Sequence, residues 1–227
     1  MDKHIWKFDT ESEYQEANTP PPYIALVDNE IRIPISIKDY EFIDMGTSVL
    51  WATKNLGAAD SISPGMYFQA GDVAGYPEPS GQPTFTDKLF DISDYKWGER
   101  YKNGKETLDP EDDAANVLIG KGARLPTIEE FEELIEACDV TVKDAYYWVG
   151  CEFVSKKDPT KRLIFSECGI AINDLIDYND SGYMTSAFSF SYVGAFMINM
   201  KNKTTSLGFS LSTENYYGYN IRPVLPK

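Results

Sequence analysis

The segment LPTIEEFEELIEAC, residues 125–138, carries the clearest structural signal in the chain. Thr127 and Glu130 have the spacing of a capping box, in which each side chain bonds to the other residue's backbone amide at a helix start. The apolar residues that follow recur at helical spacing, at Ile128, Phe131, Leu134, Ile135 and Cys138. The pattern predicts an amphipathic helix that buries one face in a core and turns its five glutamates to solvent.

A second helix is predicted within TLDPEDDAANVLIG, residues 107–120. Asp109 is a typical N-cap, Pro110 suits the first helical position, and acidic residues follow in the first turn. Gly120 marks the end of this helix. The adjoining GKGARL, residues 120–125, lacks the third glycine of a dinucleotide fingerprint and the lysine of a P-loop. We therefore interpret it as a helix stop that leads into a strand.

After Tyr146 the sequence shows no further helix signal. Short segments rich in apolar and aromatic residues alternate with loops of Gly, Asn, Asp and Ser, as is typical of strands. These segments are YYWVGCEFV, KRLIFSE, AFMINM, SLGFSLS and YNIRPVL, and VLWAT around Trp51 is a further predicted core strand. The predicted fold class is α+β, with two helices in the first half of the main domain and an antiparallel sheet mostly in the second.

Residues 1–40 are predicted to form a separate piece of the structure. A capping box formed by Thr10 and Glu13 predicts a short helix at about Thr10–Ala17, and a hairpin is expected in YIALVDNEIRIPI, with Pro34 confining its second strand to an edge. Such a piece buries little by itself, so it docks either on its own main domain or on another protein. The predicted domains are residues 1–40, an attachment segment, and residues 41–227.

Composition excludes several classes of partner. A formal net charge of −15 disfavours nucleic acid and anionic membranes, because both bind basic surfaces. Three cysteines, at positions 138, 151 and 168, lack the number and spacing of a disulfide framework or a zinc site. No apolar run is long enough to span a bilayer, so membrane insertion is not expected. The first residues lack the features of a signal peptide, so we expect no export directed by the N-terminus.

The residue types that catalysis needs do not form a recognisable pattern. His4 is the only histidine, so a Ser-His-Asp or Cys-His nucleophile system is not expected. DYNDSG, residues 177–182, fits the first positions of a calcium loop, but position twelve, which must supply a bidentate carboxylate, is Phe188. We predict no catalytic residue, no bound metal and no cofactor, and we interpret DYNDSG as a polar turn.

Residues 178–220 contain ten tyrosines or phenylalanines and sixteen serines, threonines or asparagines, but only four charged residues. This mixture is typical of surfaces used for recognition, although ordinary core strands with polar turns would explain part of it. The core interpretation covers Phe196, Ile198, Phe209, Leu211, Ile221 and Val224. The predicted ligand-binding residues lie in SAFSFSY and STENYYGY and are Phe188, Ser189, Ser191, Tyr192, Asn215, Tyr216, Tyr217 and Tyr219.

Four segments resemble, in order, the landmarks of one family. They are FIDMGTSVLWATKNLGA (42–58), GMYFQAGD (65–72), residues 107–138 and YGYNIRPV (217–224). The family is the formylglycine-generating-enzyme-type C-type-lectin-like fold, in the major paralogous (FISUMP) version found in gut bacteria and their phages. Two departures remove a tryptophan from the family's pattern, at Gln69-Ala70-Gly71 and at Met184-Thr185-Ser186. The paired cysteines of the namesake oxidase have no counterpart near the C-terminus, so the resemblance implies the fold and not that chemistry.

The resemblance also implies roles for the end of the chain. Arg222, Pro223 and Val224 would be scaffold, and the loops before them would form an exposed ligand face, which retroelements diversify in some such proteins. The first 35 residues resemble short segments at the starts of structural proteins from gut bacteriophages.

The sequence therefore predicts a non-enzymatic recognition protein on a virion. It would bind a host-surface glycan or protein through the predicted residues and other virion proteins through residues 1–40, and a homotrimer is compatible with this role. Three alternatives remain: a bacterial surface or fimbrial adhesin, a structural virion decoration protein and, least favoured, an oxidase of the formylglycine-generating type.

Overall fold

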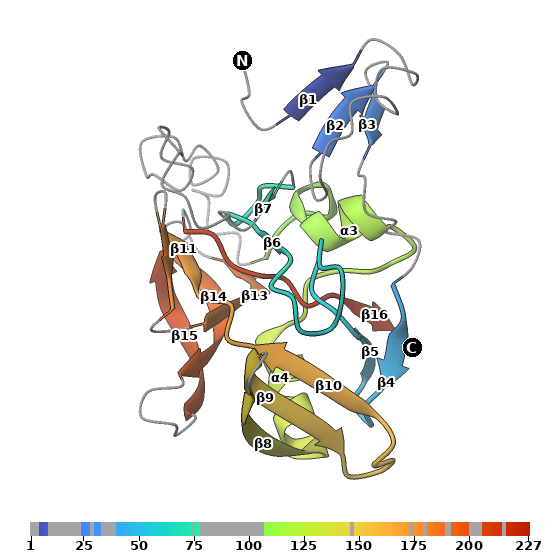
Figure 1. The fold of residues 1–227 in the computed structure, drawn as a ribbon. Coiled ribbons are helices and arrows are strands. Elements are labelled where there is room, and N and C mark those ends of the chain that lie inside the picture. The colour runs from blue at the N-terminus through green and yellow to red at the C-terminus, as the bar shows by residue number, and fades with distance from the viewer. Residues whose placement is uncertain are drawn as a thin grey trace.

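The computed structural model describes residues 5–8, 24–27, 30–32, 40–73, 75–77, 107–145, 148–172, 175–178, 181–188, 192–199, 206–214 and 217–227. These residues form a sheet-rich α+β fold with mostly antiparallel strand pairs (Figure 1). The predicted α+β fold class is therefore confirmed.

The predicted hairpin near the N-terminus is confirmed. Strands β2 (Ile24–Val27) and β3 (Glu30–Arg32) pair antiparallel, with Val27 opposite Glu30. Strand β1 (Ile5–Phe8) adds to β2 in parallel, which the sequence analysis did not predict. The predicted helix at residues 10–17 and Pro34 lie outside the described residues, and the domain boundary at residue 40 stays a prediction.

Helix α4 (Ile128–Ala137) begins with the predicted capping box. Glu130 Oε2 accepts a hydrogen bond from the Thr127 amide at 2.8 Å, and Thr127 Oγ1 accepts one from the Glu130 amide at 3.2 Å. One glutamate contradicts the prediction of a solvated face, because Glu130 is only 7% exposed and forms an ion pair with Arg124. The box turns its carboxylate back over the helix start, where Arg124 lies.

The second predicted helix is divided in two. A 3₁₀ turn, η2 (Pro110–Asp112), precedes α3 (Ala114–Ile119), and the residue that caps α3 is Asp113, not Asp109. Asp113 Oδ1 accepts from the Asn116 amide at 3.0 Å, and its Oδ2 accepts from the Leu125 amide at 2.9 Å. One buried carboxylate therefore satisfies two amides, and this fixes where the helix restarts. Gly120 ends α3 as predicted, with a positive φ of 68°.

Strands β13 (Ser181–Phe188), β14 (Tyr192–Asn199) and β15 (Ser206–Glu214) form an antiparallel sheet in that order. Successive residues of the first two strands enter two different cores, as the pleat of a strand requires. Tyr183 and Phe196 belong to one cluster, and Met184 and Ala195 belong to the other. Each face of the inner part of this sheet therefore packs against a different core cluster.

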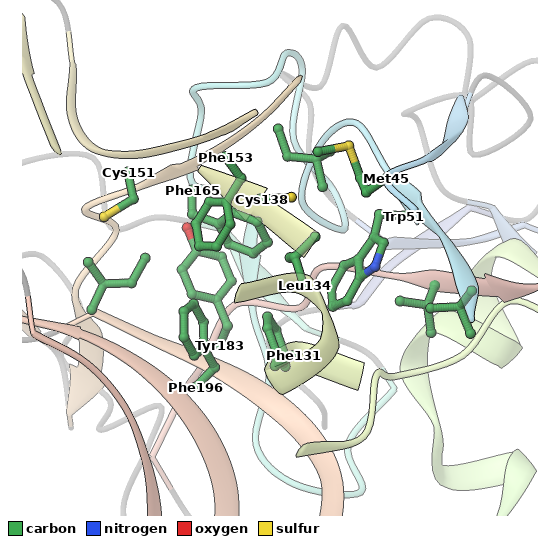
Figure 2. Close-up of a cluster of buried hydrophobic side chains, with 14 of the residues drawn as sticks. Met45, Trp51, Phe131, Leu134, Cys138, Cys151, Phe153, Phe165, Tyr183 and Phe196 are labelled. Carbon is green, nitrogen blue, oxygen red and sulfur yellow. The ribbon is translucent and has the colours of Figure 1, made fainter. Parts of the chain in front are cut away.

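Aromatic rings fill the first of these clusters. Figure 2 shows Phe165, Tyr183, Phe196 and Phe131 of α4 gathered in this cluster. The ring centroids of Phe131 and Phe196 are 4.6 Å apart, and those of Phe165 and Tyr183 are 5.0 Å apart. Trp51 packs 5.0 Å from Phe131 and is fully buried, which confirms its predicted place in the core.

The remaining strands form four smaller groups. They are β4 (Phe42–Asp44), β5 (Val49–Ala52), β6 (Met66–Tyr67), β7 (Tyr76–Pro77), β8 (Cys138–Ala145), β9 (Trp148–Ser155), β10 (Arg162–Ser166), β11 (Ile170–Ile172), β12 (Leu175–Asp177) and β16 (Val224–Pro226). They pair as β16-β5-β4, β10-β9-β8, β6-β7 and β11-β12. The C-terminal strand β16 therefore lies beside β5, against the core, as the resemblance implied for Val224.

We predict that Asp113→Ala lowers the free energy of unfolding by about 2–3 kcal/mol. The substitution removes the cap of α3 and leaves the buried Leu125 amide without its acceptor, each of which costs about 1 kcal/mol or more. Urea unfolding of the purified protein measures the loss. The matched control is Asp109→Ala, whose side chain makes no capping bond and whose loss should be smaller. Equal losses at the two positions would contradict the assignment of the cap.

Candidate functional site

The two stretches predicted to bind ligand meet at one end of the β13-β14-β15 sheet (Figure 1). Phe188, the last residue of β13, pairs with Val193, and Tyr192, the first residue of β14, pairs with Glu214, the last residue of β15. Thr213 pairs with Val193 beside them. We call these five residues the sheet end. The strand register therefore brings together segments that lie far apart in the sequence.

Six of the eight predicted ligand-binding residues belong to this end or adjoin it in the chain. Phe188 and Tyr192 are part of the sheet end itself. Ser189 and Ser191 belong to the connection between β13 and β14, Asn215 and Tyr216 directly follow β15, and all four lie outside the described residues. Ligand contact by these six residues stays a prediction.

Tyr219 contradicts the predicted exposure. Its side chain is fully buried in the second core cluster, and its backbone exchanges two hydrogen bonds of 2.9 Å with Phe68. A side chain at Gly182 would come within 2.8 Å of the Tyr219 ring, so the ring lies directly over that glycine. Tyr217 is half-buried against the same cluster. Tyr219 is therefore a core residue, and Tyr217 presents only part of its ring.

The sheet that carries this end is almost free of charge. Glu214 is the only charged residue in β13, β14 and β15. By contrast, half of the ten residues of α4 are glutamates. The charge depletion seen in the sequence is thus concentrated in one sheet and not spread over the molecule.

Both strand pairings become irregular as they approach the sheet end. The β13–β14 register shifts between Met184 and Phe188, and the β14–β15 register shifts between Val193 and Ala195. Shifts of this kind twist a strand locally and redirect its side chains, and they are frequent beside functional sites. The strand pairing is therefore irregular where the sheet approaches the predicted ligand-binding stretches.

A polar cluster that the sequence analysis did not identify lies inside the fold. Arg222 is fully buried, and its Nε donates to Asn55 Oδ1 at 2.8 Å. Its two terminal nitrogens donate to the carbonyls of Ala52 at 3.3 Å and Ile164 at 2.6 Å. Its guanidinium also lies 4.5 Å from the centre of the Phe165 ring. The predicted scaffold role of Arg222 is confirmed by this burial, and its hydrogen bonds extend that role.

Tyr183 and Cys168 extend this cluster. The Tyr183 hydroxyl donates to the Ser166 carbonyl at 2.8 Å and lies 3.5 Å from Cys168 Sγ. Burial lowers the pKa of Arg222 and raises the pKa of Tyr183 well above its ordinary value. Cys168 is 3% exposed and Tyr183 is not exposed at all. A substrate would therefore have to open the core to reach these groups, and we interpret them as structural.

Asparagines fix the C-terminal segment beside this cluster. Asn220 Nδ2 donates to the carbonyls of Pro64 at 2.9 Å and Met66 at 3.2 Å. Asn55 Nδ2 donates to the same Pro64 carbonyl at 3.0 Å. One carbonyl thus joins residues from opposite ends of the main domain.

Among the residues that the structure describes, no three His, Cys, Asp or Glu side chains gather in a way that could hold a metal ion. Within DYNDSG and its continuation, Ser181 to Phe188 are extended as β13, so the later positions of a calcium loop fall on a strand. In the described part of the chain, no helix has the length and apolar character needed to cross a membrane.

Comparison with protein-family models, curated proteins and solved structures found no match to this chain. The geometry of the sheet end and the low charge of the strands that carry it are therefore the basis for a functional proposal.

We predict that Tyr219→Ala destabilises the protein by about 3–5 kcal/mol, the usual cost of removing a large ring from a core. Urea unfolding measures this loss. The matched control is Tyr178→Ala, because Tyr178 is 51% exposed and should lose less than about 1 kcal/mol. A soluble, fully stable Tyr219→Ala protein would contradict the burial of this ring.

We also predict that the three cysteines resist alkylation in the folded protein. All three are buried thiols, and burial raises the pKa of Cys138 to about 11. At pH 8 only about one Cys138 thiol in a thousand would be ionised, and the thiolate is the nucleophile. Mass spectrometry after iodoacetamide treatment should show no label in buffer and three labels in urea. Rapid labelling of the native protein would contradict the prediction.

Proposed function

We propose that this chain is a non-enzymatic recognition protein with a C-type-lectin-like fold, which binds a host-surface glycan or protein from the surface of a phage virion. The observation that carries the proposal is the strand register, which pairs Tyr192 of the first predicted stretch with Glu214 of the second at one end of a sheet whose strands carry a single charged residue. Residues that are separated in the sequence act as one surface only if the fold brings them together, and this register does so.

The tight packing of the residues next to the sheet end favours binding. Tyr183, Met184, Ala195 and Phe196 are all at most 1% exposed, so the part of the sheet next to this end is rigidly packed. A preorganised support lowers the entropy lost when loops and side chains are ordered by a ligand. Aromatic rings add contact area with few rotatable bonds, while serine and asparagine adapt their hydrogen bonds to the partner.

The virion assignment rests on the resemblance of the first 35 residues to phage structural proteins. The hairpin of β2 and β3 and its partner β1 form a small sheet of their own in that region. A three-stranded sheet of such short strands has little core by itself, which suits a segment that is completed by docking on a neighbour. We propose that neighbouring virion proteins provide this surface.

We expect the double variant Tyr192→Ala/Tyr216→Ala to bind at least tenfold more weakly while its thermal unfolding is unchanged. Loss of two aromatic anchors from a recognition surface costs about 1.4 kcal/mol or more, which is tenfold in affinity. Binding of the labelled protein to gut bacterial cells and to a glycan array measures the change.

The control for this experiment is Tyr178→Ala, which removes an exposed tyrosine outside the sheet end and should leave binding unchanged. A double variant that binds as tightly as the parent protein would refute the role of the sheet end. Parallel loss in the Tyr178 variant would instead indicate a different surface.

A further inference from the structure

We propose that the outer edge of strand β8, residues 139–143, pairs with the same edge of a second copy of this chain and forms an antiparallel dimer. This edge belongs to the β10-β9-β8 sheet and not to the sheet end. The inference therefore goes beyond the proposed recognition function and does not depend on it. It follows from the direction of the backbone groups of β8 and from the order of its side chains.

Strand β8 lies at the edge of its sheet. It pairs with β9 on one side, and no strand that the structure describes pairs with its other side. Thr141 and Val142, in the middle of the strand, are both exposed. An edge of this kind presents a row of backbone donors and acceptors that a further strand can use.

The hydrogen bonds to β9 show which backbone groups of β8 point outward. Lys156, which follows β9, donates its amide at 2.9 Å to the carbonyl of Ala137, which precedes β8. Along an antiparallel ladder, pairs that exchange hydrogen bonds alternate with pairs that do not. Counted from Ala137, the odd-numbered residues of β8 bond to β9. The backbone groups of Val140 and Val142 therefore point toward the outer edge.

One antiparallel register uses these outward groups and also matches the side chains. With Thr141 opposite Thr141 of the second copy, each Val140 lies opposite a Val142, and the two can exchange backbone hydrogen bonds. The same register places each Asp139 opposite a Lys143. The edge is thus complementary to itself, as the two-fold interface of a homodimer requires.

The charges around Lys143 favour a second carboxylate at this position. Lys143 Nζ lies 3.1 Å from the carboxylate of Glu152, which also lies 3.1 Å from the guanidinium of Arg162. Two cations thus share one anion on this face of the sheet. Asp139 projects on the same face as Lys143, because side chains two apart in a strand share a face. Asp139 of a second copy would supply a second anion, and opposite charges that face each other across two strands stabilise the pairing.

Apolar contacts on the other face of the sheet support the same register. Val140 packs against the core cluster of Figure 2 and is partly buried. Val142 lies opposite the fully buried Cys151, yet it is 37% exposed. Pairing in this register covers each of these valines with a valine of the second copy and extends the apolar layer across the edge.

Other registers lose part of this match. A shift by two residues places Thr141 opposite Asp139 or Lys143 and removes both ion pairs. A shift by one residue opposes outward backbone groups to groups that already bond to β9. Charges on an edge strand usually prevent pairing, but here the two signs are arranged so that the edge attracts its own copy. The net charge of −15 makes two copies repel each other, so association needs a local match such as this one.

The test is sedimentation equilibrium of the full-length protein at 0.15 M NaCl, where the Debye length is about 8 Å and distant charges are screened. The protein should show a concentration-dependent equilibrium between monomer and dimer. Asp139→Lys and Lys143→Asp each place like charges opposite one another twice, so each should weaken the dimer at least about tenfold. An equimolar mixture of the two variants should form heterodimers, because every lysine then faces an aspartate again.

Two further variants separate this edge from other causes. Glu41→Lys makes the same change in net charge as Asp139→Lys, but Glu41 is exposed next to β4, in a different sheet. It should not weaken the dimer. Val142→Pro removes one outward N–H without removing a bond to β9, and proline is tolerated where the N–H of an edge strand faces solvent. It should weaken the dimer while the thermal unfolding of the monomer shows that the fold is retained.

Hydrogen exchange gives a readout that needs no variant. The amides of Val140 and Val142 should exchange slowly at high protein concentration and fast at low concentration, because only the dimer gives them acceptors. A protein that stays monomeric up to about 1 mM, a trimer, or a dimer that survives both charge reversals would overturn the proposal. A mixture of the two charge variants that fails to associate would also overturn it.

Discussion

The hydrogen bonds of the buried Arg222 hold the fold together at its last strand. Taking a guanidinium out of water is costly, and arginine keeps its charge in proteins. Here the charge is solvated by an amide oxygen, two carbonyls and the face of Phe165. These acceptors come from the strand β5, the residues after it and the strand β10. The arrangement therefore links the C-terminal segment to two sheets that are otherwise separate.

The backbone of the same segment makes further connections. Gly218 bonds to Ala171, Tyr219 to Phe68 and Asn220 to Gly182, while Val224 pairs with Trp51 on one side and Arg124 on the other. The C-terminal segment is thus hydrogen-bonded to several parts of the chain that lie far from it in the sequence. A consequence is that sequence change is costly between Gly218 and Val224, where every residue is buried.

The sequence predicted those features of the fold that depend on residues close together in the chain. The capping box of α4, the β2–β3 hairpin and the burial of Trp51 were all predictable, because spacing and apolar pattern determine them. The residue that caps α3 was not predictable, because Asp109 and Asp113 are equally suitable N-caps by residue type. The fold decides between them, since the Leu125 amide donates to the Asp113 carboxylate. The parallel addition of β1 to β2 is a non-local pairing without a turn signal.

Tyr219 shows a different limit of sequence reasoning. The composition of the surrounding segment suggested that the Tyr219 ring is exposed. The run YGYNI, however, has the alternation of a strand, and that pattern places Tyr219 on the same side as Ile221, in one core cluster. The period-two pattern predicts the burial of Tyr219 better than its residue type does. The convergence of Tyr192 and Glu214, in contrast, depends on the register of the β14–β15 pair, which no local pattern fixes.

The separation of charge from the β13-β14-β15 sheet also bears on self-association. Natural sheets usually place charges along their strands to prevent copies from pairing edge to edge, and these strands carry only Glu214. The chain has its negative charge elsewhere, and at −15 that charge still makes two copies repel each other at close approach. Strands β13, β14 and β15 can therefore stay nearly free of charge, because the negative charge on other elements opposes the pairing of two copies.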